Sequence, residues 1–159
     1  MRRARVAILG LVVASVPTLV GCSRGAAPIA RVGTASVRER WEGRALIEVE
    51  LVAENPRDVE LPIREVAYEF RLDGKTVYRG TRQGLATISR RATQRVLLPV
   101  VVPDTSALDE AREFSLSGTL WYTTPSQLAD VLFDAKISRP SVRFSGAGPV
   151  EPAGPTRNQ

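Results

Sequence analysis

The residue types that most enzymes use for catalysis are scarce in this sequence. No histidine occurs among its 159 residues, and Cys22 is the only cysteine. Without an imidazole, histidine general bases, Ser-His triads and His-ligated zinc sites are excluded. A lone cysteine provides neither an intrachain disulfide nor a thiolate metal site. A Ser-Lys pair could use only Lys75 or Lys136, and we interpret Lys75, which follows a turn, as a solvated amine. We therefore expect no metal, no cofactor and no enzymatic activity.

Two groups of acidic residues are close enough in sequence for acid–base chemistry. They are Glu48 with Glu50, and Asp109 with Glu110 and Glu113. A glycosidase places two carboxyl groups across a cleft and raises the pKa of one of them. Neither group is surrounded by the aromatic residues that would bind a sugar, and no glycine-rich phosphate loop is present. We interpret both groups as solvated surfaces.

A local basic cluster consists of Arg90, Arg91 and Arg95. Arginines close to a membrane can contact anionic lipid headgroups, so the cluster is a candidate headgroup contact. The alternative is an ordinary solvated turn.

The first residues have the composition of an export signal. Arg2, Arg3 and Arg5 precede an uncharged apolar run, Val6–Val20. A basic start followed by a short apolar core is typical of a signal peptide. A membrane-spanning helix, the alternative, needs about 20 apolar residues, and this run is shorter.

The run ends in Leu19, Val20, Gly21 and Cys22, a sequence that resembles the lipobox of bacterial lipoproteins. The resemblance implies cleavage after Gly21 and a diacylglycerol thioether on Cys22. The alternative is a plain secretory signal with an incidental cysteine. Two or more acyl chains hold a protein stably on a bilayer, so membrane lipid is the expected partner. Ser23 follows the cysteine, where an aspartate would favour the inner membrane. We therefore expect the outer membrane, facing the periplasm, if the source has two membranes.

The net charge does not favour a nucleic-acid partner. The whole chain has a formal charge of +5, with 22 basic and 17 acidic residues. Removal of residues 1–21 takes away three arginines and no acids, so the remaining chain is nearly balanced. A basic footprint for nucleic acid is therefore not expected.

Beyond the signal at 1–21, we predict an acylated N-terminus and linker at 22–30, a folded domain at 31–145 and a disordered tail at 146–159. The tail is rich in glycine and proline and has little to bury. Within the domain, alternating apolar residues and turn signals predict about seven strands. The expected strands are Val32–Arg40, Arg44–Glu54, one containing Val66–Leu72, Lys75–Arg79, Thr93–Val102, Phe114–Thr123 and Phe133–Phe144. This pattern is typical of an all-β, antiparallel β-sandwich.

Turn chemistry marks the boundaries between these strands. Asn55 and Pro56 end the second strand, because proline lacks the N–H that a sheet requires. Asp73 and Gly74 tolerate the positive φ angles of a tight hairpin, so they predict a reversal. We expect Gly80 to end the returning strand. Pro99 suggests an edge strand or a bulge. One or two helical turns are expected within residues 104–112, and a loop or helical turn within 124–130.

The central part of the chain resembles the WHy domain of type 2 late embryogenesis abundant proteins. The resemblance covers Val32–Val102 best. It rests on Asn55, Pro56, Leu61, Pro62, Ile63, Val66, Tyr68, Leu72, Gly74, Gly80 and Ile88. Plant members often have Asn-Pro-Asn, whereas Arg57 occupies the third position here. The resemblance implies an immunoglobulin-like or fibronectin type III-like sandwich, and an association with desiccation and stress tolerance. It brings no catalytic residues.

These observations leave two hypotheses for the function. The first is a non-enzymatic, membrane-tethered module of the cell envelope that binds an envelope protein or protects against water stress. The second is a carrier of lipid or another apolar ligand, because a lipid-binding role has been suggested for domains related to the WHy domain. The carrier hypothesis predicts an apolar cavity inside the domain.

Overall fold

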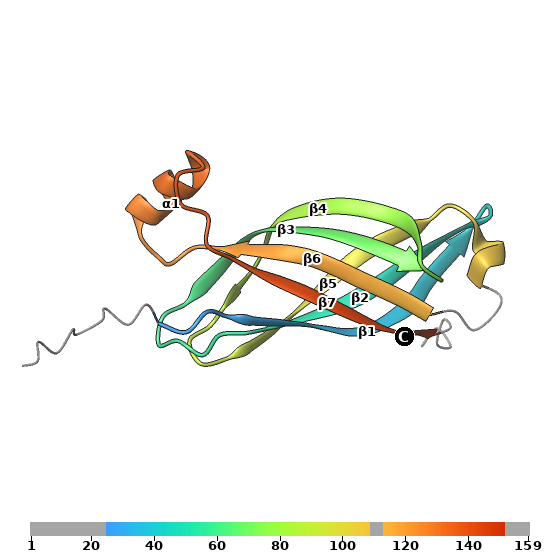
Figure 1. Cartoon of the computed structure of the whole chain (residues 1–159), viewed down its shortest axis with the longest axis horizontal. Coiled ribbons are helices and arrows are strands. Elements are labelled where there is room, and N and C mark those ends of the chain that lie inside the picture. The colour runs from blue at the N-terminus through green and yellow to red at the C-terminus, as the bar shows by residue number, and fades with distance from the viewer. Residues whose placement is uncertain (1–24, 109–112, 152–159) are drawn as a thin grey trace, which may run out of the picture.

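The computed structural model describes residues 25–108 and 113–151, which form an all-β domain with one short α-helix (Figure 1). The predicted number of strands is confirmed. The strands are β1 (Ile29–Trp41), β2 (Arg44–Glu54), β3 (Leu61–Leu72), β4 (Lys75–Ile88), β5 (Thr93–Val102), β6 (Glu113–Tyr122) and β7 (Ser141–Glu151). The helices are a 3₁₀ turn, η1 (Thr105–Leu108), and α1 (Gln127–Asp134). No helix in the described ranges is long and apolar enough to cross a membrane.

Alternation of apolar and polar residues determines the best-predicted strands. β2 and β5 have the bounds that their sequence patterns predict. The apolar residues of β2 are buried and alternate with half-buried polar ones. Successive side chains of a strand point to opposite faces, so this pattern places one face in the core and the other against water.

All seven strands belong to one sheet, in the order β4-β3-β6-β7-β1-β2-β5. Neighbouring strands are antiparallel except β1 and β7, which are parallel and are joined by the pairs Ala35–Val150 and Ser36–Glu151. The sheet curls into a nearly closed barrel around one apolar core (Figure 1). The all-β class is therefore confirmed. The sheet is mixed, however, so a purely antiparallel arrangement is wrong, and an immunoglobulin-like or fibronectin-like sandwich is not confirmed.

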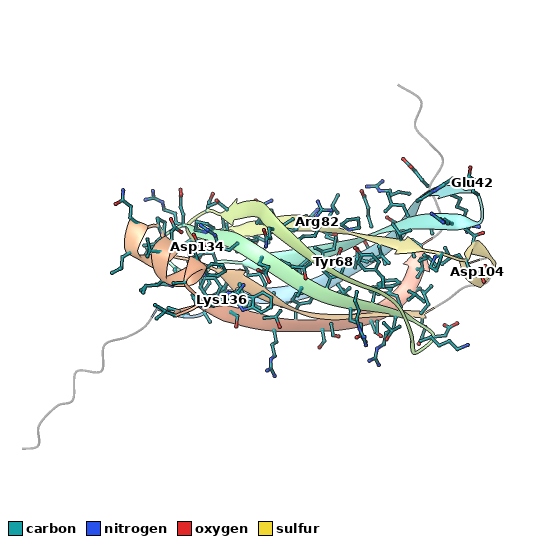
Figure 2. The ribbon with its side chains drawn as sticks, turned by 90° about the horizontal axis from the view of Figure 1, so that it is seen from above. Glu42, Tyr68, Arg82, Asp104, Asp134 and Lys136 are labelled. Carbon is teal, nitrogen blue, oxygen red and sulfur yellow. The ribbon has the colours of Figure 1, made fainter. Side chains whose placement is uncertain are left out.

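The two ends of this strand order, β4 and β5, are the edges at which the barrel fails to close. Pro99 lies on β5, so its predicted position on an edge strand is confirmed. The Tyr68 hydroxyl of β3 donates a hydrogen bond of 2.6 Å to the Pro99 carbonyl oxygen. Burial is the main cause that raises the pKa of the Tyr68 hydroxyl, which is therefore a stable donor. Figure 2 shows Tyr68 near the middle of the barrel.

The β3–β4 hairpin confirms one prediction and corrects another. Asp73 and Gly74 have φ angles of 46° and 78°, as a tight turn requires. Gly80 does not end the returning strand, because β4 continues to Ile88. A Cβ atom at Gly80 would lie 2.5 Å from the ring of Tyr78, two residues earlier on the same face. Gly80 therefore lies within β4 and leaves space for the Tyr78 ring.

The last predicted strand, Phe133–Phe144 with an interruption at Pro140, is confirmed only from Ser141 onward and is wrong before it. Residues 127–134 form α1, and β7 begins only at Ser141. The predicted disordered tail is also wrong over residues 146–151, which continue β7. At Gly146, a Cβ atom would lie 2.5 Å from Cβ of Val32, so this glycine permits close packing on β1. Residues 152–159 lie outside the described residues, as do Cys22 and the signal at 1–21. The predicted linker is shorter than expected, because β1 begins at Ile29.

The up-and-down course of the strands gives the barrel two distinct ends. We call one the near end: it holds residues 25–28, the loop 55–60, the loop 89–92 and the segment 123–140. The opposite, far end holds the turns 42–43 and 73–74 and the η1 turn. In Figure 1, α1 and the start of β1 lie at the near end, and Figure 2 shows Asp134 and Lys136 there, with Glu42 and Asp104 at the far end.

Candidate functional site at the near end of the barrel

The Asn55 side chain is the centre of a buried hydrogen-bond network at the near end. Asn55 is only 1% exposed. The amide nitrogen donates to the carbonyl oxygens of Val59 at 2.7 Å, Ser89 at 3.0 Å and Ile88 at 3.3 Å. The amide oxygen accepts from the Arg57 N–H at 3.0 Å. We call these contacts the Asn55 network. They join the loop 55–60 to the end of β4, and they give the Asn-Pro motif a structural role.

Backbone hydrogen bonds reinforce the same junction. The Asn55 N–H donates to the Ala92 carbonyl oxygen at 2.8 Å, and the Arg91 N–H donates to the Arg57 carbonyl oxygen at 2.9 Å. Arg91 has a φ angle of 50°, which turns the chain tightly at this point. The loops 55–60 and 89–92 are therefore held together along their length. At the third motif position the Arg57 backbone N–H makes the contact with Asn55, so this hydrogen bond does not depend on the side chain there.

The predicted arginine cluster is only partly assembled. Arg90 and Arg91 lie together in the loop 89–92, at the near end. Arg91 forms a two-pronged ion pair with Asp58 across the junction, and its hydrogen bond holds the pKa of Asp58 below its ordinary value. Arg95 instead lies on β5, where its Nε is 3.0 Å from Glu50. Arg95 and Arg91 therefore have different carboxylate partners, and Arg90 is exposed.

Glu48 and Glu50, one of the two predicted acidic groups, pair with arginines. Glu48 pairs with Arg38 at 2.5 Å, and Glu50 pairs with Arg95 on the outer face of β2. Glu113 begins β6, and Asp109 and Glu110 lie outside the described residues. Elsewhere on the outer face, hydrogen bonds from Arg79, Arg71 and Thr76 lower the pKa of Glu69 to about 2. Glu48, Glu50 and Glu69 are therefore partners of arginines on the outer face of the sheet.

Helix α1 begins within residues 124–130, where a loop or helical turn was expected, and continues into residues predicted as strand. The Ser126 hydroxyl accepts a hydrogen bond from the Ala129 N–H at 3.0 Å and thereby caps the helix. Asp130 and Asp134, one helical turn apart, accept hydrogen bonds from Arg64 of β3 at 2.8 and 3.2 Å. Phe133 is buried beneath the same guanidinium, 5.3 Å from its ring centre.

The signal for α1 was present but short. A serine cap followed by apolar residues at helical spacing occurs at Ser126, Leu128, Val131 and Leu132. The helix has only eight residues, so its periodicity covers little more than two turns. Phe133 is its buried residue, and the Asp130 and Asp134 side chains that reach Arg64 remain 47% and 68% exposed. The exposed side chains of this segment include Leu128, Val131 and Ile137.

The described residues form hollows on the surface of the sheet. One, of about 530 Å³, lies over β3, β4 and β6 and is lined by Ala67, Tyr68, Glu69, Arg79, Gly80, Thr81, Ser117, Gly118 and Thr119. Inside the barrel, Phe70 and Phe114 stack with ring centres 5.7 Å apart. An interior apolar cavity, which the carrier hypothesis predicts, is not shown.

Comparison with known families places this geometry in context. The chain matches the sequence profile described as late embryogenesis abundant protein (LEA_2) over residues 50–138. This span is more than half of the chain and includes the Asn55 network and α1. No curated protein sequence matches the chain significantly.

Several solved structures share the fold. One is the solution structure of a protein described as a late embryogenesis abundant (LEA) protein, At2g46140.1, with 13% identity and a TM-score of 0.57 over 81% of this chain and 73% of that chain. Another is AT1g01470 from Arabidopsis thaliana, with 13% identity and a TM-score of 0.54 over 80% and 83%. A third is the Northeast Structural Genomics Consortium target SoR45, with 11% identity and a TM-score of 0.52 over 83% and 90%. At these identities, the likeness shows the fold alone.

Proposed function

Because the chain belongs to the late embryogenesis abundant type 2 family, we propose that it is a non-enzymatic, lipid-anchored protein that protects the bacterial cell envelope under water stress. The observation that carries the proposal is the family match over residues 50–138. The matched span holds the hydrogen-bonded Asn55 motif on which the resemblance to the WHy domain rests. The family association with desiccation tolerance supplies the physiological setting.

The lipid anchor is supported by the sequence and by the position of the first described residue. Cys22 ends the lipobox-like run, and Gly25 follows three residues later. Three residues span at most about 11 Å. An acylated Cys22 would therefore hold the near end of the barrel close to the bilayer surface, and the folded domain would remain in water on one side of it.

A cysteine variant tests the anchor. We expect Cys22→Ala to abolish acylation, so the protein should leave the membrane fraction or accumulate unprocessed. Ser23→Asp is the matched variant next to the anchor: it should keep acylation and shift the protein toward the inner membrane if the source has two membranes. Mass spectrometry and membrane fractionation measure both results. Unchanged membrane association of Cys22→Ala would overturn the proposal.

A drying assay tests the protective role. Vesicles that carry the acylated protein should lose less entrapped dye after drying and rehydration than vesicles without it. The matched control is the same amount of protein with Asn55→Ala, which we expect to be destabilised. Equal dye loss with and without the folded protein would contradict protection, even if the anchor is confirmed.

A further inference from the structure

Helix α1 leaves apolar side chains exposed that an ordinary surface helix would bury. An amphipathic helix normally turns its apolar face to the core and its polar face to water. Here only Phe133 is buried, Asp130 and Asp134 reach Arg64 with partly exposed side chains, and Leu128 and Val131 are 68% and 63% exposed. These two apolar residues are three positions apart and therefore lie on one helical face.

The orientation of α1 is fixed by several independent contacts. The Ser126 cap holds its first turn, and Phe133 is buried between two guanidinium groups. Arg64 lies 5.3 Å from the Phe133 ring centre, and Arg139 lies 4.7 Å from it. Arg139 is itself tied to Glu65 of β3 at 2.8 Å. The helix cannot rotate its apolar face inward without losing these contacts.

The exposed apolar residues gather at the near end. Eight large apolar side chains of the described residues are exposed, and five of them belong to this end. The five are Ile29, Val59, Leu128, Val131 and Ile137, the last with 74% exposure. The other three are Trp41 near the far end and Leu97 and Val101 on β5. Leu128, Val131 and Ile137 belong to one segment, and neighbouring exposed apolar residues mark an interaction surface more often than isolated ones do.

The near end carries exposed charges of both signs, among them Glu60 and Asp134 as well as Arg90 and Lys136. Arg64 lies between the two carboxylates of α1, and Arg91 pairs with Asp58. Basic side chains beside exposed apolar ones are typical of surfaces that lie in the headgroup region of a bilayer. The chain that leads to Cys22 also leaves the barrel at this end, from Gly25.

We propose that the outward face of α1, formed by Leu128 and Val131 and continued by Ile137, lies in the headgroup region of the bilayer to which the chain is anchored. The near end then faces the membrane and the far end points away from it. This inference rests on the proposed lipid anchor, because an acylated Cys22 would hold α1 within reach of the lipid.

Fluorescent labels on the intact, acylated protein test this orientation. Acylation uses the sulfur of Cys22, so a single introduced cysteine is the only one that a thiol-reactive dye can label. The variants are Val131→Cys on α1 and Lys75→Cys at the far end. Both are placed in phosphatidylethanolamine–phosphatidylglycerol vesicles with a shallow lipid quencher. We expect quenching at least threefold stronger for the label at 131 than for the label at 75.

The same samples separate failure of this inference from failure of the anchor. Protein that does not sediment with the vesicles, or that takes up dye at Cys22, lacks the anchor. Sedimenting protein with equal, weak quenching at both positions keeps the anchor and overturns the orientation. A label at 131 that is unquenched in pure vesicles but inaccessible in whole cells would show a protein partner on α1, which also overturns it.

A second set of variants tests the apolar residues themselves. Leu128→Ser, Val131→Ser and Ile137→Ser together should reduce quenching of a label at Ser138→Cys at least twofold, because the anchor alone then orients the domain. The matched control replaces the exposed Leu97 and Val101 of β5 with serine and should leave that quenching unchanged. Thermal unfolding checks that both remain folded, since all five side chains are exposed. Equal quenching in both sets would overturn the proposal.

Discussion

Two attachments at the near end of the barrel hold their segments in different ways. The Asn55 side chain is buried, and its network uses neutral groups only. The attachment of α1 uses partly exposed ion pairs between Arg64 and two carboxylates, together with one buried ring, Phe133. Buried hydrogen bonds are costly to lose, whereas exposed ion pairs contribute little stability. The first attachment therefore determines whether the barrel folds, and the second determines which face α1 shows.

Replacement of Asn55 should have the largest effect. In Asn55→Ala, three carbonyl oxygens and the Arg57 N–H lose their side-chain partner in a buried place. We expect the free energy of unfolding to fall by at least about 3 kcal/mol, measured by urea denaturation.

The control for Asn55→Ala is Gln94→Ala. The Gln94 side chain donates one hydrogen bond, to the Arg95 carbonyl oxygen at 2.9 Å, in an exposed place. This control should cost less than about 0.5 kcal/mol. Similar losses in both variants would mean that the burial of Asn55 does not matter, and the contrast between the two attachments would fail.

Replacement of Arg64 should free α1 and leave the barrel folded. Arg64→Ala removes both ion pairs and one ring contact of the helix, so we expect a local loss of about 1 kcal/mol. Hydrogen exchange should accelerate for the α1 amides and stay unchanged for the β2 amides. Arg38→Ala, which breaks a pair with Glu48 on the outer face, is the control and should leave α1 unaffected. Equal acceleration in β2 would show that Arg64 supports the whole barrel.

Loss of the α1 cap should have a smaller, purely local effect. Ser126→Ala leaves the Ala129 N–H without its side-chain acceptor, which typically costs about 1 kcal/mol of helix stability. Because α1 contributes little to the core, the melting temperature of the barrel should hardly change, while α1 exchange accelerates. Ser138→Ala, an exposed serine after the helix, should change neither. A large drop in melting temperature would mean that α1 folds together with the barrel.

The sequence predicted one of these attachments better than the other. Alternation in β2 and the Asp73–Gly74 turn are local signals, and both were confirmed. The Asn-Pro turn was predicted from residue types as well. Its partners at Ile88 and Ser89, more than thirty residues away, depend on how the barrel closes and carry no local signal.

The wrong predictions at Gly80, Gly146 and α1 have a common physical cause. Glycines and short helices do not define a structure by their local sequence, because contacts with distant residues determine it. Gly80 resembles a strand end, and Gly146 resembles part of a disordered tail. Each is a place where another side chain needs the space of a missing Cβ. In α1, eight residues give too few turns to define a period, and the contact that orients the helix comes from Arg64, on a strand more than sixty residues earlier.

The smallest predicted effect is the dependence of the Asp58–Arg91 pair on pH. This exposed pair joins the loops 55–60 and 89–92, which the buried Asn55 side chain also joins. Its hydrogen bond lowers the pKa of Asp58 in the folded protein from the ordinary value of 3.8. A lowered pKa stabilises the folded state above the ordinary value, and this contribution disappears as the pH falls through the lowered one. The difference in melting temperature between wild type and Asp58→Asn should therefore be small and constant near neutral pH and shrink below pH 3.8.

Salt provides the second half of this test. Asp58 and Arg91 are both exposed, so high salt should reduce the same difference at neutral pH. The unfolding free energy lost in Asn55→Ala should not change with acid or salt, because the Asn55 amide carries no charge. The melting-temperature difference between wild type and Asp58→Asn could instead persist in acid and in salt. Asp58 would then stabilise the junction by hydrogen bonding and packing, and the exposed and buried halves of the junction would act as one unit.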